Sequence, residues 1–160
     1  MIQRIQSIYL VLAGIFSAFT CFVPVATFNH TDGKGAIWFH MSSIEYYGSV
    51  LFESLSEMTG RHPWGLAVMA ALTTILAVVA IFCFKNRKRQ VKMVNVCSLI
   101  NVVWYVAFAA YAFSVKSRTA FDLSLEVGCL FPLLSLITLF LAKRAIKHDE
   151  ALVRAADRIR

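Results

Sequence analysis

The sequence WGLAVMAALTTILAVVAIFCF, residues 64–84, decides the fold of this chain, because none of its 21 residues carries a charge. A helix needs about 20 such residues to cross a bilayer core of about 30 Å. Three further stretches have the same character, interrupted only by Glu126: residues 8–26, 93–115 and 123–142. The whole chain is 59% hydrophobic, whereas soluble domains are roughly 45–50% apolar. The sequence therefore predicts an all-α membrane protein with four transmembrane helices in a single integral domain, residues 1–160.

Charged residues are distributed unevenly around these four stretches. With a cytoplasmic N-terminus, the cytoplasmic segments hold 12 basic and three acidic residues, and the outer segments hold four basic and six acidic residues. An excess of Lys and Arg on the cytoplasmic side orients helical membrane proteins. We therefore expect both termini to be cytoplasmic and the helices to form an up-down bundle. The same bias accounts for the net charge of +7, so we expect no nucleic-acid partner.

The first apolar stretch lies within MIQRIQSIYLVLAGIFSAFTCF, residues 1–22, and has two interpretations. A cleaved signal peptide has a basic start, an apolar core of about 7 to 15 residues and small residues before the cut. Arg4 supplies the charge, but the apolar run is longer, and residues 18–20 fit a cleavage site poorly. We therefore expect a retained first span whose helix starts before Ile8.

Two segments carry a resemblance to a known family: MIQRIQSIYLVLAG at residues 1–14 and FKNRKRQVK at residues 84–92. Together with the order of the spans, they resemble an uncharacterised family of small four-span inner-membrane proteins from Gram-negative bacteria, classed only as a domain of unknown function. The resemblance implies the fold and a location in the bacterial inner (cytoplasmic) membrane. It implies no reaction, cofactor or catalytic residue.

The longest segment outside the predicted spans is the outer loop at residues 27–63. An Asp32-Gly33 pair between short runs of aromatic and β-branched residues predicts a β-hairpin. Beyond it, the pattern Ser42-x-x-Glu45 is typical of a helix N-terminus, and apolar residues then recur at helical spacing. We expect a small extracytoplasmic hairpin followed by an amphipathic helix at the membrane surface.

The C-terminal segment, residues 143–160, contains neither proline nor glycine. Ala145, Leu152 and Ile159 are seven residues apart and form a weak apolar stripe between charged faces. This pattern predicts a cytoplasmic helix that lies on the inner leaflet or docks on a partner. A solvated tail is the alternative.

No pattern typical of an active site, a nucleotide site or a metal site is found. The cysteines form no Cys-x-x-Cys pair, and no phosphate-binding loop or nucleophile elbow occurs. His30 and His40 have no spacing typical of zinc ligands. We therefore expect no enzymatic activity, no cofactor and no metal. A disulfide between Cys21 and Cys129 is an alternative to buried thiols.

Polar side chains inside the predicted spans concentrate on the third span, where they recur every three or four residues. In lipid, such groups bond to neighbouring helices or line a ligand cavity. Glu126 is the only acid within a span, and its alternatives are a functional role or an interfacial carboxylate paired with Arg118 or water. The candidate ligand or helix-contact residues are Asn95, Ser98, Asn101, Trp104, Tyr105 and Glu126.

A basic cluster lies between the second and third predicted spans. Near an anionic inner leaflet, each such residue gains about 1 kcal/mol from lipid. The expected lipid-contact residues are Lys85, Arg87, Lys88, Arg89 and Lys92.

Two functions fit these observations. The favoured one is a non-enzymatic accessory or scaffold subunit of a membrane protein assembly, which contacts a membrane protein partner or a second copy of itself. The alternative is a lipid, quinone or small-molecule binding protein or transporter with a cavity in the helix bundle.

Overall fold

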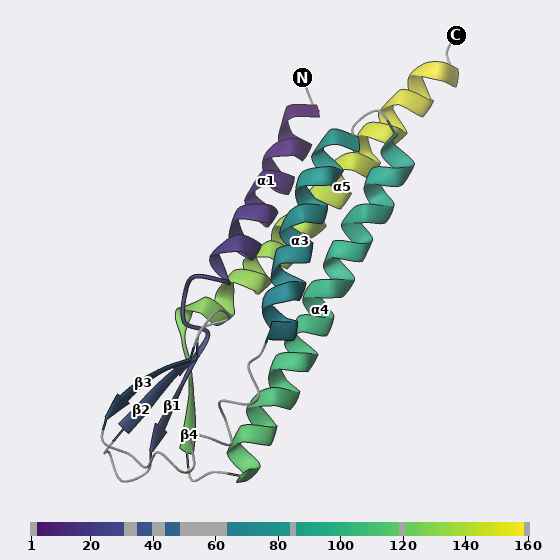
Figure 1. Ribbon diagram of the computed structural model, residues 1–160. Helices are drawn as coiled ribbons and strands as arrows, with labels where there is room; N and C mark the ends of the chain where they lie inside the picture. Colours follow the sequence, from purple (N-terminus) through teal and green to yellow (C-terminus); the bar gives the residue numbers. More distant parts are fainter. Residues whose placement is uncertain are drawn as a thin grey trace.

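The computed structural model describes residues 3–30, 35–39, 44–48, 64–83, 86–118 and 121–158. Within these residues, four α-helices form one part of the molecule and four β-strands the other (Figure 1). The helices are α1 (Gln3–Phe19), α3 (Trp64–Phe82), α4 (Arg87–Arg118) and α5 (Leu130–Arg158). The strands are β1 (Ala26–His30), β2 (Gly35–Phe39), β3 (Ile44–Gly48) and β4 (Phe121–Leu125), and a 3₁₀ turn at Val127–Cys129 joins β4 to α5.

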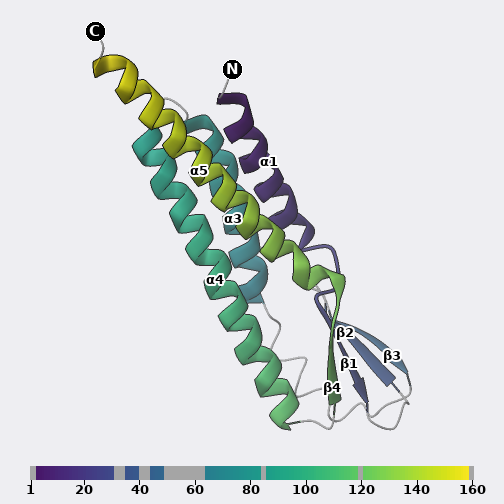
Figure 2. The ribbon, with the colours of Figure 1, turned by 180° about the vertical axis from the view of Figure 1, so that it is seen from behind.

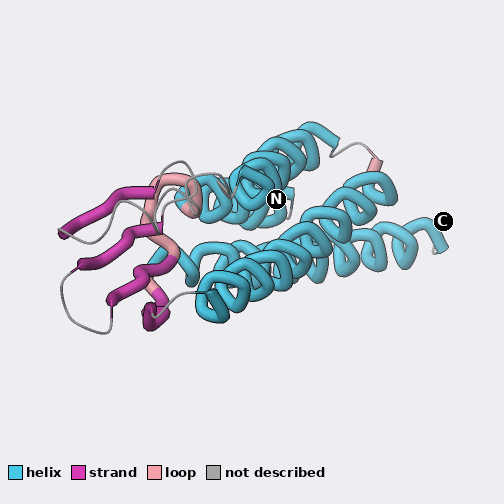
Figure 3. Tube along the Cα trace, turned by 60° about the horizontal axis from the view of Figure 1, so that its bottom comes forward, coloured by secondary structure: helices cyan, strands magenta, loops and turns pink. Residues whose placement is uncertain are grey.

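The four helices lie side by side, and successive helices run in opposite directions (Figures 1 and 2). Helix α1 packs against α3 and α5, and α4 packs against the same two helices. Both termini lie at one end of the helices (Figures 1 and 2), whereas the strands lie beyond the other end (Figure 3). The prediction of four helices is therefore confirmed.

In the part of the chain that the structure describes, three helical segments are long and apolar enough to cross a membrane: Trp64–Phe82, Arg87–Ser114 and Val127–Val153. The apolar part of the first helix, Ile5–Phe19, is shorter. The expected character of a membrane protein is confirmed to that extent. The side of the membrane on which the termini lie stays a prediction.

The outward faces of the helices are apolar, and polar side chains turn inward. The exposed apolar residues include Ile8, Val11, Ile15, Val68, Leu72, Ile75, Leu99, Val106, Phe113, Leu133, Ile137 and Phe140. Ser17, Thr73 and Ser135 are buried, and each donates a hydrogen bond to a backbone carbonyl. In lipid, polar groups must find partners inside the protein. This distribution is compatible with a membrane protein.

Small residues and hydroxyls bring α1 close to its two neighbours. A Cβ at Gly14 would lie 3.7 Å from the Cβ of Ala77 on α3. The Ser17 hydroxyl donates to the Ala70 carbonyl of α3 at 3.0 Å, and the Ser135 hydroxyl of α5 donates to the Ala13 carbonyl at 3.1 Å. Helices in lipid associate through close backbone approach and hydrogen bonds of this kind.

The strands form one antiparallel sheet in the order β3-β2-β1-β4. In the predicted hairpin, Ala26 of β1 is opposite Phe39 of β2. The hairpin is confirmed, and β4 extends it on the other side, with Ala26 opposite Leu125. A two-stranded hairpin alone is marginally stable, so the two additional strands supply the support that the hairpin needs.

The predicted amphipathic helix after Ser42 is wrong at its start, because Ile44–Gly48 is strand β3. Its backbone pairs with β2 in the register Ile44 opposite Phe39. The segment holds an isoleucine and two tyrosines, which favour a pleated surface, and the free edge of β2 decides between helix and strand. Ser42 and residues 49–63 lie outside the described residues.

Two predicted span boundaries are also wrong. The first span was expected to reach Ala26, but α1 ends at Phe19 and Ala26 begins β1. The fourth was expected to start at Leu123, which lies in β4, and α5 starts only at Leu130. In both segments, pairing in the sheet displaces the helix. The predicted cytoplasmic helix is the direct continuation of α5, which runs without interruption to Arg158.

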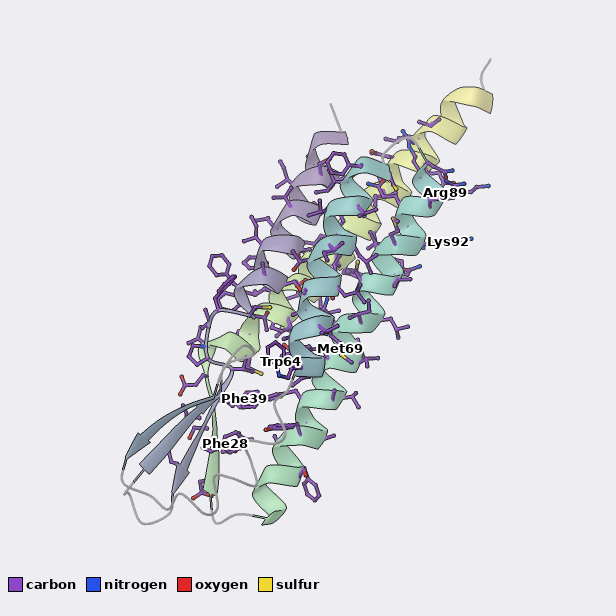
Figure 4. All side chains as sticks on the ribbon, in the orientation of Figure 1. Phe28, Phe39, Trp64, Met69, Arg89 and Lys92 are labelled. Atoms are coloured by element: carbon purple, nitrogen blue, oxygen red, sulfur yellow. The ribbon has the colours of Figure 1, made fainter. Side chains whose placement is uncertain are left out.

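An aromatic cluster joins the sheet to α4. Phe28 and Phe39 point from the sheet toward the helices (Figure 4), and both are buried. The ring of Phe39 lies 6.5 Å from that of Phe108 and 5.1 Å from that of Tyr111. Trp104 stacks on Phe108 at 5.4 Å. The sheet and the helices thus share one hydrophobic core.

Candidate functional site

The predicted candidates Trp104 and Tyr105 lie where α4 meets the sheet and the start of α5, and Asn101 lies about one turn before them on α4. Asn101 is 4% exposed, and its amide donates to the Cys97 carbonyl of its own helix at 3.2 Å. The Tyr105 hydroxyl donates to the Cys129 carbonyl at 2.7 Å. These polar groups therefore act within the protein, one inside α4 and one between α4 and the start of α5.

Asn95 and Ser98 do not share this location. Asn95 is exposed, and the half-buried Ser98 hydroxyl donates to the Val94 carbonyl of its own helix at 2.9 Å. The buried face of α4 is formed by Gln90, Val94, Cys97, Asn101, Trp104, Phe108 and Ala112. The residues of this face recur every three or four positions. Asn101 is one of them, whereas Asn95 and Ser98 lie beside this face.

Trp104 has a polar atom that its surroundings leave unused. Its side chain is 2% exposed, and its indole Nε1 has no hydrogen-bond partner among the described residues. Its ring packs edge-on to Tyr105 and stacks on Phe108. The Trp104 ring thus takes part in the hydrophobic core that α4 shares with the sheet.

Glu126 lies outside α5, between β4 and the 3₁₀ turn. Its carboxylate accepts a hydrogen bond from the Thr27 hydroxyl of β1 at 3.0 Å. Its backbone N–H donates to the Val25 carbonyl at 3.0 Å. The side chain of Arg118, its expected partner, lies outside the described residues. In the structure Glu126 thus links the end of β4 to β1.

Replacing Thr27 by valine tests this link. The variant keeps the shape of the side chain and leaves the carboxylate of Glu126 without its donor, so we expect a loss of about 1 kcal/mol in the free energy of unfolding. Thermal unfolding of the purified chain in detergent measures the loss. Glu126→Gln is the control, because its amide oxygen still accepts from Thr27. If Glu126→Gln destabilises as much as Thr27→Val, the carboxylate charge has a role beyond this hydrogen bond.

The basic cluster lies at the opposite end of the helices, near the termini. Arg89 and Lys92 project away from α4 (Figure 4), and Lys88 is exposed as well. Arg87 turns inward, where its guanidinium donates to the Asp149 carbonyl at 3.0 Å. Lys85 lies outside the described residues. The exposed members are available to a lipid surface, whereas Arg87 joins α4 to α5.

A buried polar pair that the sequence predictions missed lies beside Arg87. Gln6 of α1 and Asp149 of α5 are each 5% exposed, and the Gln6 amide donates to the Oδ2 of Asp149. The other carboxylate oxygen, Oδ1, is buried and has no hydrogen-bond partner among the described residues. A buried acceptor without a donor costs free energy of folding. Of the atoms described at this end of the molecule, Asp149 Oδ1 is therefore the one for which a hydrogen-bond donor would gain most.

A signal for this pair exists in the sequence. The buried residues of α5 include Leu139, Ala142, Ile146 and Asp149, which follow one another at spacings of three, four and three. Gln6 continues the buried face of α1 in the same way, four residues before Leu10. A polar residue in register with an apolar face indicates a buried position.

A pocket of about 420 Å³ adjoins this pair, between α1 and α5. We call it the α1/α5 pocket. Ile5 and Tyr9 of α1 line it, with Leu141, Arg144, His148 and Asp149 of α5. It combines an apolar wall with a carboxylate and two nitrogen-bearing side chains, so it can hold an amphiphile with groups of both charges.

All four cysteines are free thiols, so Cys21 and Cys129 are not bridged in the structure. Burial raises the pKa of the Cys21 thiol above its ordinary value, which disfavours the reactive thiolate. No group of three metal-ligand side chains occurs among the residues that the structure describes. His40 and the side chain of His30 lie outside them.

Comparison with known proteins locates the chain in one family. No curated protein matches the sequence. The model of a domain of unknown function, DUF4293, matches residues 2–159. This match covers nearly the whole chain and agrees with the resemblance seen in the opening segment and in the basic cluster. The chain therefore belongs to the DUF4293 family, whose function is unknown.

Proposed function

We propose that this protein is a non-enzymatic accessory or scaffold subunit of an assembly in the bacterial inner membrane, which it crosses four times with both termini in the cytoplasm. The observation that carries the proposal is the apolar outward surface of the helices. Ile8 is 55% exposed, Ile75 58% and Phe140 65%. A continuous apolar surface of this kind marks contact with lipid or with other membrane helices.

The filled interior of the helices favours a scaffold over a transporter. At mid-length the space between them is occupied by fully buried Leu10, Ala77, Cys97 and Leu139. A transport pathway needs polar or ionisable side chains that reach a central cavity. Asn101, the central polar residue of α4, is engaged by its own helix.

The orientation is tested by labelling single introduced cysteines in a background that lacks the native ones. Asp122 on β4 and Lys147 on α5 are both exposed and lie at opposite ends of the molecule. In intact spheroplasts, we expect a membrane-impermeant maleimide to label Asp122→Cys, and Lys147→Cys only after permeabilisation. The reverse pattern would overturn the proposed orientation, and a chain absent from the membrane fraction would overturn the membrane location.

The role is tested by extraction at native abundance in mild detergent after crosslinking. We expect at least one membrane protein to co-purify in a fixed ratio. Recovery only as a monomer or a self-oligomer under every mild condition would contradict a scaffold role within a larger assembly.

The second candidate function, binding of a lipid, quinone or other small molecule, is favoured by one observation. The α1/α5 pocket offers a cavity of about 420 Å³, at the cytoplasmic end in the proposed orientation. This candidate differs from the predicted site around Asn101, Trp104, Tyr105 and Glu126, where side chains pack against one another.

A further inference from the structure

We infer that the α1/α5 pocket binds the headgroup of a phospholipid with a primary ammonium group, of the phosphatidylethanolamine type. The inference rests on the membrane location proposed above and extends it to one lipid class. It is carried by the polarity of the pocket, by the unpartnered oxygen of Asp149 and by the two nitrogen-bearing side chains at the rim.

The pocket changes from polar to apolar along the helices. Asp149 and His148 lie at the end near the termini, and Leu141 lies eight residues along α5 toward the sheet, which is about 12 Å at the helical rise. Tyr9 lies one turn deeper than Ile5 on α1. A phospholipid in the cytoplasmic leaflet has the same gradient, with its charged headgroup at the surface and its acyl chains toward the middle.

Asp149 supplies the most specific element. Its carboxylate is 95% buried, since 5% of the residue is exposed, and only Oδ2 receives a hydrogen bond from a described side chain. Oδ1 has no partner among the described residues, although Asp149 lines the pocket. A primary ammonium group suits such an oxygen in two respects. It carries the opposite charge, and it has N–H groups that donate hydrogen bonds.

Arg144 and His148 complete the match at the rim. They are four residues apart on α5, hence about one turn apart on the same face, and both are exposed. Guanidinium and imidazole N–H groups are suited to phosphate oxygens. Within one pocket, the phosphate of the headgroup would thus contact Arg144 and His148, and its ammonium group would contact Asp149.

The donor requirement selects among common phospholipids. A choline headgroup has a positive charge but no N–H, and it leaves Oδ1 without a hydrogen bond. A glycerol headgroup has hydroxyl donors but no positive charge. Only a primary ammonium group provides both, so the pocket discriminates by headgroup rather than by acyl chain.

The test uses the full chain, purified in detergent and stripped of lipid, then titrated with phosphatidylethanolamine or phosphatidylcholine of identical acyl chains. Native mass spectrometry counts the bound lipids. We expect phosphatidylethanolamine to bind about tenfold more tightly, as one charge-assisted hydrogen bond allows. Asp149→Asn should lose this preference. Asp122→Asn at the far end of the molecule is the matched control and should keep it.

Equal affinity of the wild-type chain for the two lipids would overturn the inference, as would an Asp149→Asn variant that keeps the preference. If Asp149→Asn does not fold, Arg144→Gln decides, because an exposed side chain can be changed without disturbing the core. It should weaken binding of both lipids severalfold, relative to Lys147→Gln outside the pocket. Unchanged binding of both lipids would also refute the pocket.

Two further arms separate the sources of failure. Soluble glycerophosphoethanolamine carries the same headgroup without acyl chains and should compete at least tenfold more weakly than the lipid. Competition at equal concentration would identify a soluble phosphoamine as the ligand and overturn the lipid assignment. A chain found in the membrane fraction without headgroup preference would refute the pocket alone and leave the membrane location standing.

Discussion

Replacing Gly128 by alanine is expected to lower the free energy of unfolding by about 3 kcal/mol, the upper part of the range for overpacking a closed site. A Cβ at this position would lie 2.3 Å from the Pro24 carbonyl oxygen and 2.7 Å from its carbonyl carbon. Both are backbone atoms, so no side-chain rotation relieves the overlap. The Gly128 N–H also donates to the Pro24 carbonyl at 3.0 Å. If the segment at Pro24 and the turn at Gly128 move apart to make room for the Cβ, this hydrogen bond lengthens.

Gly65→Ala is the matched control for this variant. No heavy atom lies within 4 Å of a Cβ built at Gly65, and alanine favours the helix that starts there. In thermal unfolding in detergent, Gly65→Ala should therefore melt at or above the wild-type temperature, while Gly128→Ala melts well below it. Equal melting temperatures for Gly128→Ala and the wild-type chain would contradict the close packing of Gly128 on the Pro24 backbone.

Replacing Gln6 by leucine is expected to cost about 2 kcal/mol, because the carboxylate of Asp149 then keeps its burial and loses its donor. The loss arises from desolvation rather than from volume, since leucine fills a similar space. Unfolding of the purified chain in lipid-free detergent measures it.

The double variant Gln6→Leu/Asp149→Leu separates the hydrogen bond from the burial. Replacing both partners of a buried pair by apolar groups is often nearly neutral, so the double variant should be close to the wild-type chain in stability. A double variant that loses the sum of the two single losses would show that Gln6 and Asp149 act independently.

The sequence was sufficient to predict the four helices, although not the end of α1 or the start of α5. Residues 64–84 and 93–115 are long, apolar and uncharged, so α3 and α4 follow from the length of a membrane crossing and from nothing else. The hairpin was equally accessible, because Asp32-Gly33 is a local turn signal between strand-forming residues. Both features depend on residues close together in the chain.

The missed elements, β3 and β4, are decided by pairing with another strand rather than by their own local pattern. Phe121, Leu123 and Leu125 alternate with Asp122 and Ser124, which is the period of a strand, but the apolar residues that follow made the segment resemble the start of a span. The segment of β3 is similarly predicted as a helix, because its local pattern fits a helix and a strand equally well. Its pairing with the edge of β2 decides for the strand. In both segments the neighbouring strand in the sheet decides the structure, and for β4 that strand, β1, is also distant in the chain.

Most of the predicted ligand or helix-contact residues lie inside one span, whereas the buried pair that was missed joins two helices distant in the sequence. Asn101, Trp104 and Tyr105 were found because polar or aromatic residues inside a span are conspicuous, and the structure places them on consecutive turns of α4. Gln6 and Asp149 were missed because both lie near predicted span ends, where polar residues are ordinary. Only the packing of α1 on α5 shows that they are buried together.

The pairing of β1 with β4 determines the order in which the protein is assembled. Ala26 pairs with Leu125, and both α3 and α4 lie between them in the chain. During synthesis, β1 and β2 therefore emerge long before β4, and contacts between residues so far apart form slowly. The sheet reaches its full width only after α4 has been synthesised. The 3₁₀ turn and α5 still follow β4 in the chain, so the sheet is completed late in synthesis but before the last helix.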